Sequence, residues 1–322
     1  MADDPLVTVV FATHNRADRL PALLRSLRAQ TLGTTRFEVV VVDNGSTDDT
    51  PGVLLREMES GGLALRVLRH NEPRGPARAR NAGWRAGQGG LFAFTDDDCV
   101  ASPDWLAAGV AAWEGDPERI VQGRTDPDPA EMDRMGPYGR TLRIHDLGPY
   151  YQTCNVFYPR ALLERADGFD AEAFPGLSAE DADLAWRCLE TGATSRFAPE
   201  AQVFHAVHEL GPAGRLRIAW RPHEAVQVFA RHPEWRSTLT YGLFWKGTHY
   251  LLARAALGLL LPRRRGLGPL RFWCLAPIVP SYLRRGPDEG GSLRHGPYFL
   301  LHDVVETAAV IRGAVRYRTL VI

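Results

Sequence analysis

Three consecutive aspartates, Asp96, Asp97 and Asp98, follow a short apolar run in the segment "FAFTDDDCV". Adjacent carboxylates repel one another unless a cation or protons neutralise them. Hard cations such as Mg²⁺ and Mn²⁺ bind carboxylate oxygens, commonly together with substrate phosphates. The run is therefore consistent with a cation that bridges to a diphosphate. A solvated turn or helix cap is the alternative, and the run alone favours neither.

Two earlier segments carry side chains that could bind a nucleotide. Asp43 in "DNGSTDDT" follows an apolar strand and could accept a hydrogen bond from a base N–H, although a turn before a helix would look the same. Arg78 and Arg80 in "GPARARNAG" lie near an expected helix start, where the helix dipole favours anions. Exposed arginines on a helix are the ordinary alternative for this second segment.

A third acidic group occurs in "SAEDADLAWR", which contains Glu180, Asp181 and Asp183. One of these carboxylates could act as a general base, but an acidic first turn stabilised by the helix dipole is the simpler interpretation of the segment alone. His205 in "AQVFHAVH" ends a short alternating stretch. This segment by itself favours a core histidine over a metal ligand at position 205.

Strands and helices alternate through the first hundred residues, and these elements must position the chemistry. Apolar, β-branched runs predict strands at 6–15, 37–46, 63–71 and 90–98, and helical periodicity predicts helices at 18–30, 46–58 and 75–87. One face of the first helix would carry Leu20, Leu23, Leu24 and Leu27. This order predicts a mostly parallel, doubly wound α/β sheet.

Ligands of such sheets bind beyond the carboxyl ends of the strands. Three expected strands end in polar residues, at Thr13 to Asn15, at Asp43 and Asn44, and at the three aspartates. We therefore expect all three ends to face one crevice.

Several element boundaries can be predicted from capping residues. Ser46 or Thr47 would cap the second helix, and Gly87 would end the third. Ser178 would cap a later helix that stops at Gly192. The proline-rich and charged segment 126–139 is typical of a loop or linker.

Composition limits the possible function classes. The 322 residues include 38 Lys and Arg and 38 Asp and Glu, so the formal net charge is near zero. Nonspecific electrostatic binding of nucleic acid is therefore not expected. The four cysteines show no zinc spacing and are expected to be free thiols in a reducing compartment. The N-terminus lacks the pattern of a signal peptide, which predicts a cytoplasmic protein. Peripheral attachment to the inner face of the plasma membrane is the alternative location.

Six segments then occur in the order of a known family: "VVFATHNRADRLPALLRSL", "VVVVDNGSTDDT", "PRGPARARNAGWRAG", "LFAFTDDDCVASPDWL", "NVFYPRALLERADGFDAEAF" and "SAEDADLAWRCLETG". Over roughly residues 5–210 the chain resembles the family 2 glycosyltransferases of the GT-A fold. The resemblance implies a nucleotide-diphospho-sugar transferase fold with a C-terminal helical extension. It divides the chain into a donor-binding half at 1–125, an acceptor-binding half with the catalytic base at 126–210, and a helical region at 211–322.

The resemblance also implies a role for each candidate residue on the donor side. The donor would be a UDP-, GDP- or dTDP-sugar, and the residues expected to bind it are Thr13, Asn15, Asp43, Arg80, Asp96 and Asp97. The three aspartates match the DxD-type motif of the family. Asp98 would bind a divalent cation, Mn²⁺ or Mg²⁺, with His205 as a further metal ligand.

On the acceptor side, Asp181 matches the catalytic base of the family, with Glu180 beside it. Trp105 would pack against the site or in the core. Relatives often carry a small residue where "QTCNVFY" has Cys154, so Cys154 and Asn155 would shape the acceptor pocket. The implied reaction is a direct displacement that inverts the anomeric centre, with a glycan, a lipid-linked molecule or a small molecule as the hydroxyl acceptor.

Other function classes fit the chain less well. The aspartate run also matches the DxDx[TV] pattern of haloacid-dehalogenase-like phosphohydrolases, but that family places the motif after its first strand, and here three strands precede it. Nucleotidylyl transfer would need a glycine-rich loop after the first strand. A non-catalytic module that binds sugar or nucleotide would not need both acidic motifs.

The last eighty residues mix aromatic, apolar and arginine side chains, as interfacial membrane segments do. Their uncharged stretches are too short to span a bilayer, which needs about 20 residues. Arg263 to Arg265 could meet anionic lipid headgroups. The region therefore predicts peripheral membrane contact, with a packed helical subdomain or a homodimer interface as the alternative.

Overall fold

The computed structural model describes residues 5–176, 178–264, 266–283 and 294–322. The chain forms two compact units. The first contains Met1–Met132 and Thr141–Val207, and the second contains Asp133–Arg140 and His208–Ile322. We describe each unit by itself.

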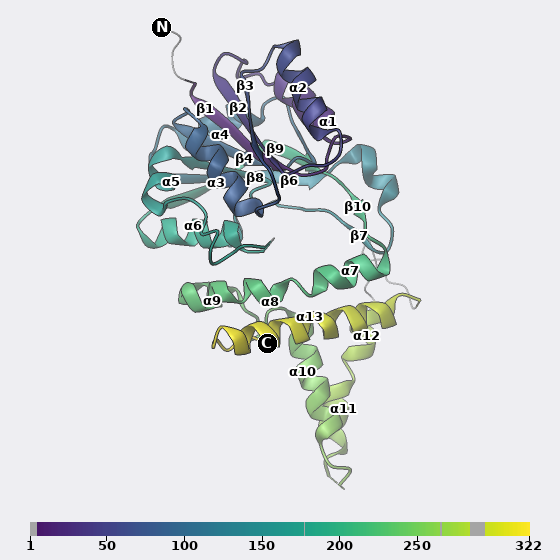
Figure 1. Cartoon of the computed structure of the whole chain (residues 1–322). Helices are drawn as coiled ribbons and strands as arrows, with labels where there is room; N and C mark the ends of the chain where they lie inside the picture. The colour runs from purple at the N-terminus through teal and green to yellow at the C-terminus, as the bar shows by residue number, and fades with distance from the viewer. Residues whose placement is uncertain (1–4, 177, 265, 284–293) are drawn as a thin grey trace. The chain divides into compact units, whose positions relative to one another are not determined.

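An eight-stranded sheet forms the centre of the first unit (Figure 1). Its strands are β1 (Val7–Thr13), β2 (Phe37–Asn44), β3 (Leu65–His70), β4 (Leu91–Thr95), β5 (Cys99–Ala101), β6 (Arg119–Pro127), β8 (Asn155–Pro159) and β9 (Thr194–His205), in the order β3-β2-β1-β4-β8-β6-β9-β5. The first four strands are parallel, as predicted. Strand β8 runs antiparallel to β4 and β6, whereas β6 and β9 are parallel, so the second half of the sheet is mixed.

Helices cover both faces of this sheet. They are α1 (Leu20–Arg28), α2 (Thr50–Ser60), α3 (Pro76–Ala86), α4 (Trp105–Trp113), α5 (Arg160–Ala166) and α6 (Glu180–Glu190). Because side chains alternate along a strand, Val9 of β1 packs in a cluster with α1, α2 and α4, while Val10 packs in a second cluster with α3, α5 and α6. All four leucines predicted on one face of α1 are buried.

Some predicted boundaries are wrong. Helix α2 starts later than predicted, with Asp49 rather than Ser46 or Thr47 at its N-cap. Helix α6 follows Ala179, a left-handed residue with φ of 68°, so Ser178 is not its cap. Both predictions depended on residue preference alone, and the Ser46 hydroxyl instead accepts a hydrogen bond from the distant Asn15 N–H.

Other predictions at this level are confirmed. Gly87 is the C-cap of α3. The segment 126–139, predicted as a loop or linker, is only partly irregular, because it contains the end of β6, a 3₁₀ helix η1 (Pro129–Arg134) and the start of β7. All four cysteines are buried free thiols.

The second unit is mainly helical, as predicted for the C-terminal region. A short ribbon pairs β7 (Gly139–Arg140) with β10 (His208–Glu209). The helices are α7 (Gly211–Ala219), α8 (Pro222–Ala225), α9 (Gln227–Arg231), η2 (Pro233–Thr238), α10 (Gly247–Leu260), α11 (Gly268–Leu275), α12 (Ile278–Leu283) and α13 (Gly296–Arg316). Helix α13 packs against α7, α8, α10 and α12. Within the described ranges, no helix is both long enough and apolar enough to cross a bilayer.

Candidate functional site

The carboxyl ends of β1 and β2 bring two predicted nucleoside residues together. Thr13 and Asp43 are direct partners in the parallel register of these strands, and both are buried. Asp43 Oδ1 accepts a hydrogen bond of 2.9 Å from the Ser46 backbone N–H. Its Oδ2 lies 3.5 Å from Arg69 Nε. The carboxylate is therefore fixed in orientation at the strand end.

Asn15 joins the loops that follow these two strands. Its backbone is left-handed, with φ of 54°, a conformation that asparagine tolerates better than most residues. The Asn15 N–H donates to Ser46 Oγ at 2.9 Å, and Asn15 Oδ1 accepts from the Thr47 N–H at 2.7 Å. These bonds explain why Ser46 and Thr47 do not cap α2.

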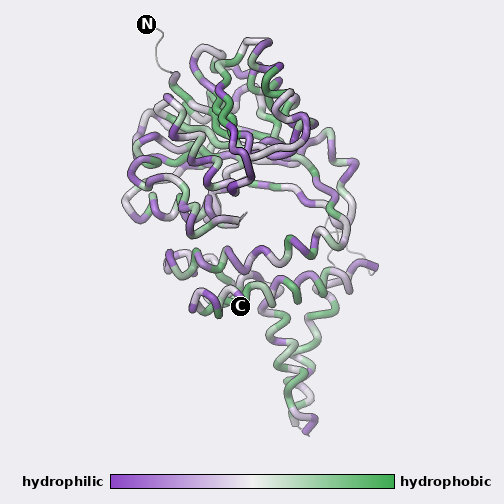
Figure 2. The backbone as a smooth tube through the Cα atoms, viewed as in Figure 1, coloured by the Kyte–Doolittle hydropathy of each residue, from purple (hydrophilic) through white to green (hydrophobic). Residues whose placement is uncertain are grey.

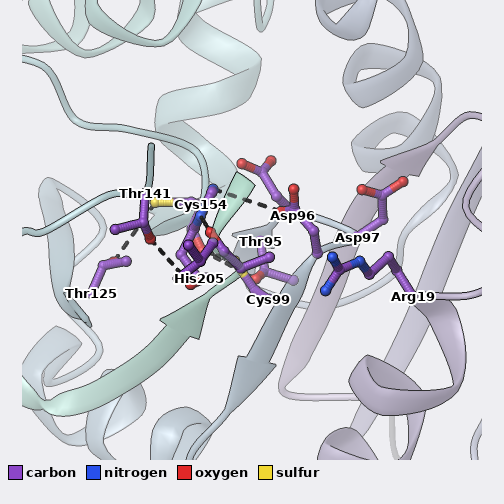
Figure 3. A network of polar contacts seen from close by, with 12 residues as sticks. Arg19, Thr95, Asp96, Asp97, Cys99, Thr125, Thr141, Cys154 and His205 are labelled. Carbon is purple, nitrogen blue, oxygen red and sulfur yellow. Dashed lines mark hydrogen bonds and ion pairs between the residues drawn. The ribbon is translucent and has the colours of Figure 1, made fainter. Parts of the chain in front are cut away.

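The three aspartates follow β4 but differ in environment, and Figure 3 labels two of them, Asp96 and Asp97. Burial and the charge of Asp98 raise the pKa of Asp97 to about 7. Arg16 contributes a cation here, with Nε 3.7 Å from Asp97 Oδ1 and Nη2 3.9 Å from Asp98 Oδ2. The sequence reasoning missed Arg16, although it directly follows the polar end of β1.

Arg80 connects the aspartate run to the second acidic motif. Its Nη2 donates to Asp96 Oδ1 at 3.0 Å, and its Nη1 donates to Glu180 Oε1 at 2.9 Å. Burial lowers the pKa of Arg80, but the two carboxylates outweigh this effect and raise it above its ordinary value. One buried guanidinium thus holds the ends of β4 and α6 in a single site.

Asp181 lies at the start of α6, half-buried, and its Oδ1 accepts a hydrogen bond of 2.8 Å from the Ala182 N–H. Burial raises its pKa to about 7, and the charge of Glu180 adds to the shift. Burial also raises the pKa of Glu180, while Arg80 opposes that change. A carboxyl group with a pKa near 7 is suited to proton transfer at neutral pH.

His205 ends β9, where it pairs with Cys99 of β5. Its Nδ1 donates to the Ala206 carbonyl at 2.8 Å, so in the neutral tautomer the lone pair is on Nε2. Nε2 lies 3.7 Å from Asp98 Oδ1, and both side chains are about nine-tenths buried. A backbone carbonyl that fixes the other ring nitrogen is typical of metal-binding histidines. The pair fits a divalent cation, which takes oxygen and imidazole ligands.

The Thr141 hydroxyl also donates to the His205 carbonyl, at 3.2 Å, and helps to hold this strand end in place (Figure 3). Another buried acid steadies the adjacent loop. Glu131 pairs with Arg19 and accepts a hydrogen bond of 2.9 Å from the Val207 N–H. The sequence reasoning did not identify Glu131, because it lies in the segment interpreted as a linker.

Trp105, Asn155 and Cys154 lie in the buried framework under the site. Trp105 Nε1 donates to Asn155 Oδ1 at 2.8 Å, which matches the core-packing alternative for the tryptophan. Asn155 Nδ2 donates to the carbonyls of Arg124 and Ala201 at 2.7 and 2.8 Å. Cys154 is 1% exposed. An acceptor-side role for these residues stays a prediction, since their polar atoms contact other protein groups.

Comparison with known proteins relates the chain to a family. The family model described as "Glycosyl transferase family 2" matches residues 8–169. The chain is 33% identical over 215 residues to glycosyltransferase AglE of Haloferax volcanii, which covers 64% of this chain and 69% of that relative. It is 31% identical over 240 residues to validoxylamine A glucosyltransferase of Streptomyces hygroscopicus subsp. jinggangensis, covering 64% of this chain and 56% of that relative.

A solved structure is similar over nearly the whole chain. It is the mannosyltransferase PcManGT from Pyrobaculum calidifontis in complex with GDP-Man and Mn²⁺. The TM-score is 0.58 at 22% identity, and the match covers 98% of this chain and 87% of that one. This likeness confirms the predicted GT-A fold with additional C-terminal helices.

Proposed function

Because the chain belongs to glycosyl transferase family 2, we propose that it moves a sugar from a nucleoside-diphosphate sugar to an acceptor hydroxyl. The observation that carries this proposal is the Arg80 bridge between Asp96 and Glu180. This bridge brings together two parts of the site. One is an acidic run that suits a diphosphate and its cation, and the other is the start of α6, where the Asp181 carboxyl group is suited to act as a base. A transferase needs both parts in one site.

The donor side of the proposal uses the strand ends. The buried carboxylate of Asp43 accepts a base N–H, and Thr13 and Asn15 line the nucleoside, while Asp96, Asp97 and Arg80 border the ribose and diphosphate. The relatives support a nucleotide-sugar donor, since PcManGT is described in complex with GDP-Man. The proposed donor is a UDP-, GDP- or dTDP-sugar.

Asp98 and His205 would hold the divalent cation. When bound, Mn²⁺ or Mg²⁺ would offset the negative charge of the donor diphosphate and of the leaving group. The tautomer of His205 and the buried Asp98 oxygen beside it support this assignment. The Mn²⁺ in the PcManGT complex favours manganese.

The proposed reaction is one displacement. The carboxylate of Asp181 takes the proton of the acceptor hydroxyl. The hydroxyl oxygen forms a bond to the anomeric carbon while the bond from that carbon to the diphosphate oxygen breaks, and the nucleoside diphosphate leaves. Attack opposite the leaving group inverts the anomeric centre. The charge of Glu180, which is held by Arg80, helps to raise the pKa of the base.

The acceptor assignment rests on the framework residues. Trp105, Cys154 and Asn155 would act by positioning the strands around the acceptor pocket, because their side chains are buried. The division into a donor half at 1–125 and an acceptor half at 126–210 follows from this assignment. For the C-terminal region, peripheral attachment to a membrane is preferred to a homodimer interface, and the next subsection develops it.

The central test is Asp181→Asn in the full-length protein, incubated with Mn²⁺ and a panel of nucleotide sugars. We expect donor binding to stay within about twofold while transfer falls by a factor of about 10² to 10⁴, the usual contribution of a general base. Asp167→Asn, on a side chain that is 91% exposed, is the matched control. Full activity of Asp181→Asn would exclude Asp181 as the base. Binding of a donor without turnover by the wild type would favour a non-catalytic module.

A further inference from the structure

Helices α10 and α11 of the second unit form a hairpin with an unusually apolar surface. Leu260 is 81% exposed, Phe272 is 74% exposed and Leu259 is 69% exposed. Leu257, Leu270 and Trp273 are also exposed. Figure 2 shows the hairpin as a largely hydrophobic projection that extends away from the other helices of its unit. Several large apolar side chains exposed on one hairpin indicate an interaction site.

The hairpin is a defined structure, because its two helices pack closely. A Cβ atom at Gly258 would lie 2.6 Å from the Cys274 Cβ, so only glycine permits this approach. The Arg254 guanidinium lies 3.5 Å from the centre of the Trp273 ring and donates to the Trp273 carbonyl. The exposed apolar side chains are therefore displayed on a fixed scaffold.

A buried polar cluster attaches the base of the hairpin to α13. His249, at the start of α10, is fully buried, and its Nε2 lies 3.3 Å from Glu306 Oε2 on α13. Lys246 pairs with the same Glu306 carboxylate. Breaking a buried pair of this kind is costly, so the hairpin is held to the body of its unit.

The charges of this segment all have one sign. Residues 241–283 contain no Asp or Glu but six basic residues, namely Lys246, Arg254, Arg263, Arg264, Arg265 and Arg271. Arg263 and Arg264 are exposed in the turn between the two helices. Arginines beside exposed leucine, phenylalanine and tryptophan are characteristic of segments at a membrane surface, where the charges meet lipid phosphates.

We propose that the α10–α11 hairpin docks on an anionic lipid bilayer, with its apolar side chains in the headgroup boundary and its turn arginines on the phosphates. No helix among the described residues could span the bilayer, so contact would be interfacial. A second copy of the chain is a poorer partner. A two-fold interface sets a surface patch against itself, which would place these basic residues near one another with no acid of the segment between them.

The test is flotation of the full-length protein with vesicles of phosphatidylcholine alone or with 30% phosphatidylglycerol. We expect recovery with the anionic vesicles and little with the neutral ones. The variant Arg263→Gln/Arg264→Gln should lose affinity by about fivefold per arginine, because each basic residue near an anionic surface contributes about a factor of five. The variant Leu260→Ser/Phe272→Ser should lose most of the recovery. A matched control is Leu55→Ser/Met58→Ser, which removes two exposed apolar side chains from α2.

Two results would overturn the proposal. One is equal recovery of the wild type and both hairpin variants. The other is absence of the wild type from anionic vesicles, together with a dimer in light scattering that Leu260→Ser/Phe272→Ser converts to a monomer. That outcome would assign the surface to a second copy of the chain. Since flotation measures binding without catalysis, the result is independent of the proposed transfer reaction.

Discussion

Removing the Arg80 guanidinium should show how strongly the stability of the first unit depends on this buried cation. In Arg80→Met the side chain keeps a similar length but loses its charge, which leaves Asp96 and Glu180 without their shared partner. The lost hydrogen bonds are 3.0 and 2.9 Å long. The Glu180 side chain is 8% exposed and the Asp96 side chain 29%, so solvent screens Asp96 more than Glu180.

The magnitude follows from these distances and exposures. Two unit charges 4 Å apart attract by about 4 kcal/mol at an effective dielectric constant of about 20. Measured losses on removing one partner of a buried pair are about 3–5 kcal/mol. We therefore expect Arg80→Met to lower the free energy of unfolding of the first unit by about 3–5 kcal/mol at pH 8.

The loss should depend on pH in a defined direction. Burial raises the pKa of Glu180, and Arg80 opposes that shift, so removing Arg80 raises the pKa of Glu180 further. The folded variant then avoids the unpaired charge by binding a proton as the pH falls. The difference in stability from the wild type should thus be largest at pH 8 and shrink toward pH 5.

Urea unfolding at pH 8 and pH 5 measures the effect. The buried thiols of Cys99, Cys154 and Cys188 report on the first unit alone, through labelling in urea followed by peptide mass spectrometry. Arg85→Met is the control on the same helix. Its partner Asp167 is 91% exposed, and exposed pairs contribute below about 1 kcal/mol. The charged network around Arg80 would be refuted if Arg80→Met lost no more stability than the control. It would also be refuted if the loss of stability were the same at both pH values.

Two further predictions concern the reaction. Because the base must be deprotonated and burial raises the pKa of Asp181 to about 7, kcat should fall as the pH drops through about 7, and a flat profile from pH 5.5 to 8.5 would exclude this assignment. Nucleoside diphosphate at about 100 times its Kd should stabilise the wild type by about 2.7 kcal/mol only with Mn²⁺ or Mg²⁺ present. Asp98→Asn and His205→Ala should weaken this protection in thermal unfolding, and protection unchanged by both would remove them as ligands.

Much of the first unit could be predicted from local patterns. The unbroken apolar run of β2 and the four leucines of α1 indicate which side chains are buried, because the period of apolar residues follows the geometry of a strand or helix. The six ordered segments identified the family and the fold, both of which are confirmed. The caps predicted at Ser46 and Ser178 were wrong, because capping preference is a weak local signal, and at Ser46 a tertiary hydrogen bond from Asn15 overrides it.

The second half of the sheet and the links within the site needed the tertiary structure. No periodicity in the sequence reveals that β8 runs antiparallel between β4 and β6, since strand direction depends on long-range pairing.

The residue types at Asp98, Asp181 and His205 were visible in the sequence, and the family resemblance suggested their roles. Only the folded chain brings Arg80 between Asp96 and Glu180 and turns the His205 ring toward Asp98. The shifted pKa values of Asp97 and Asp181 also arise there, because desolvation and neighbouring charge depend on what surrounds a group in space, and sequence neighbours supply only part of those surroundings.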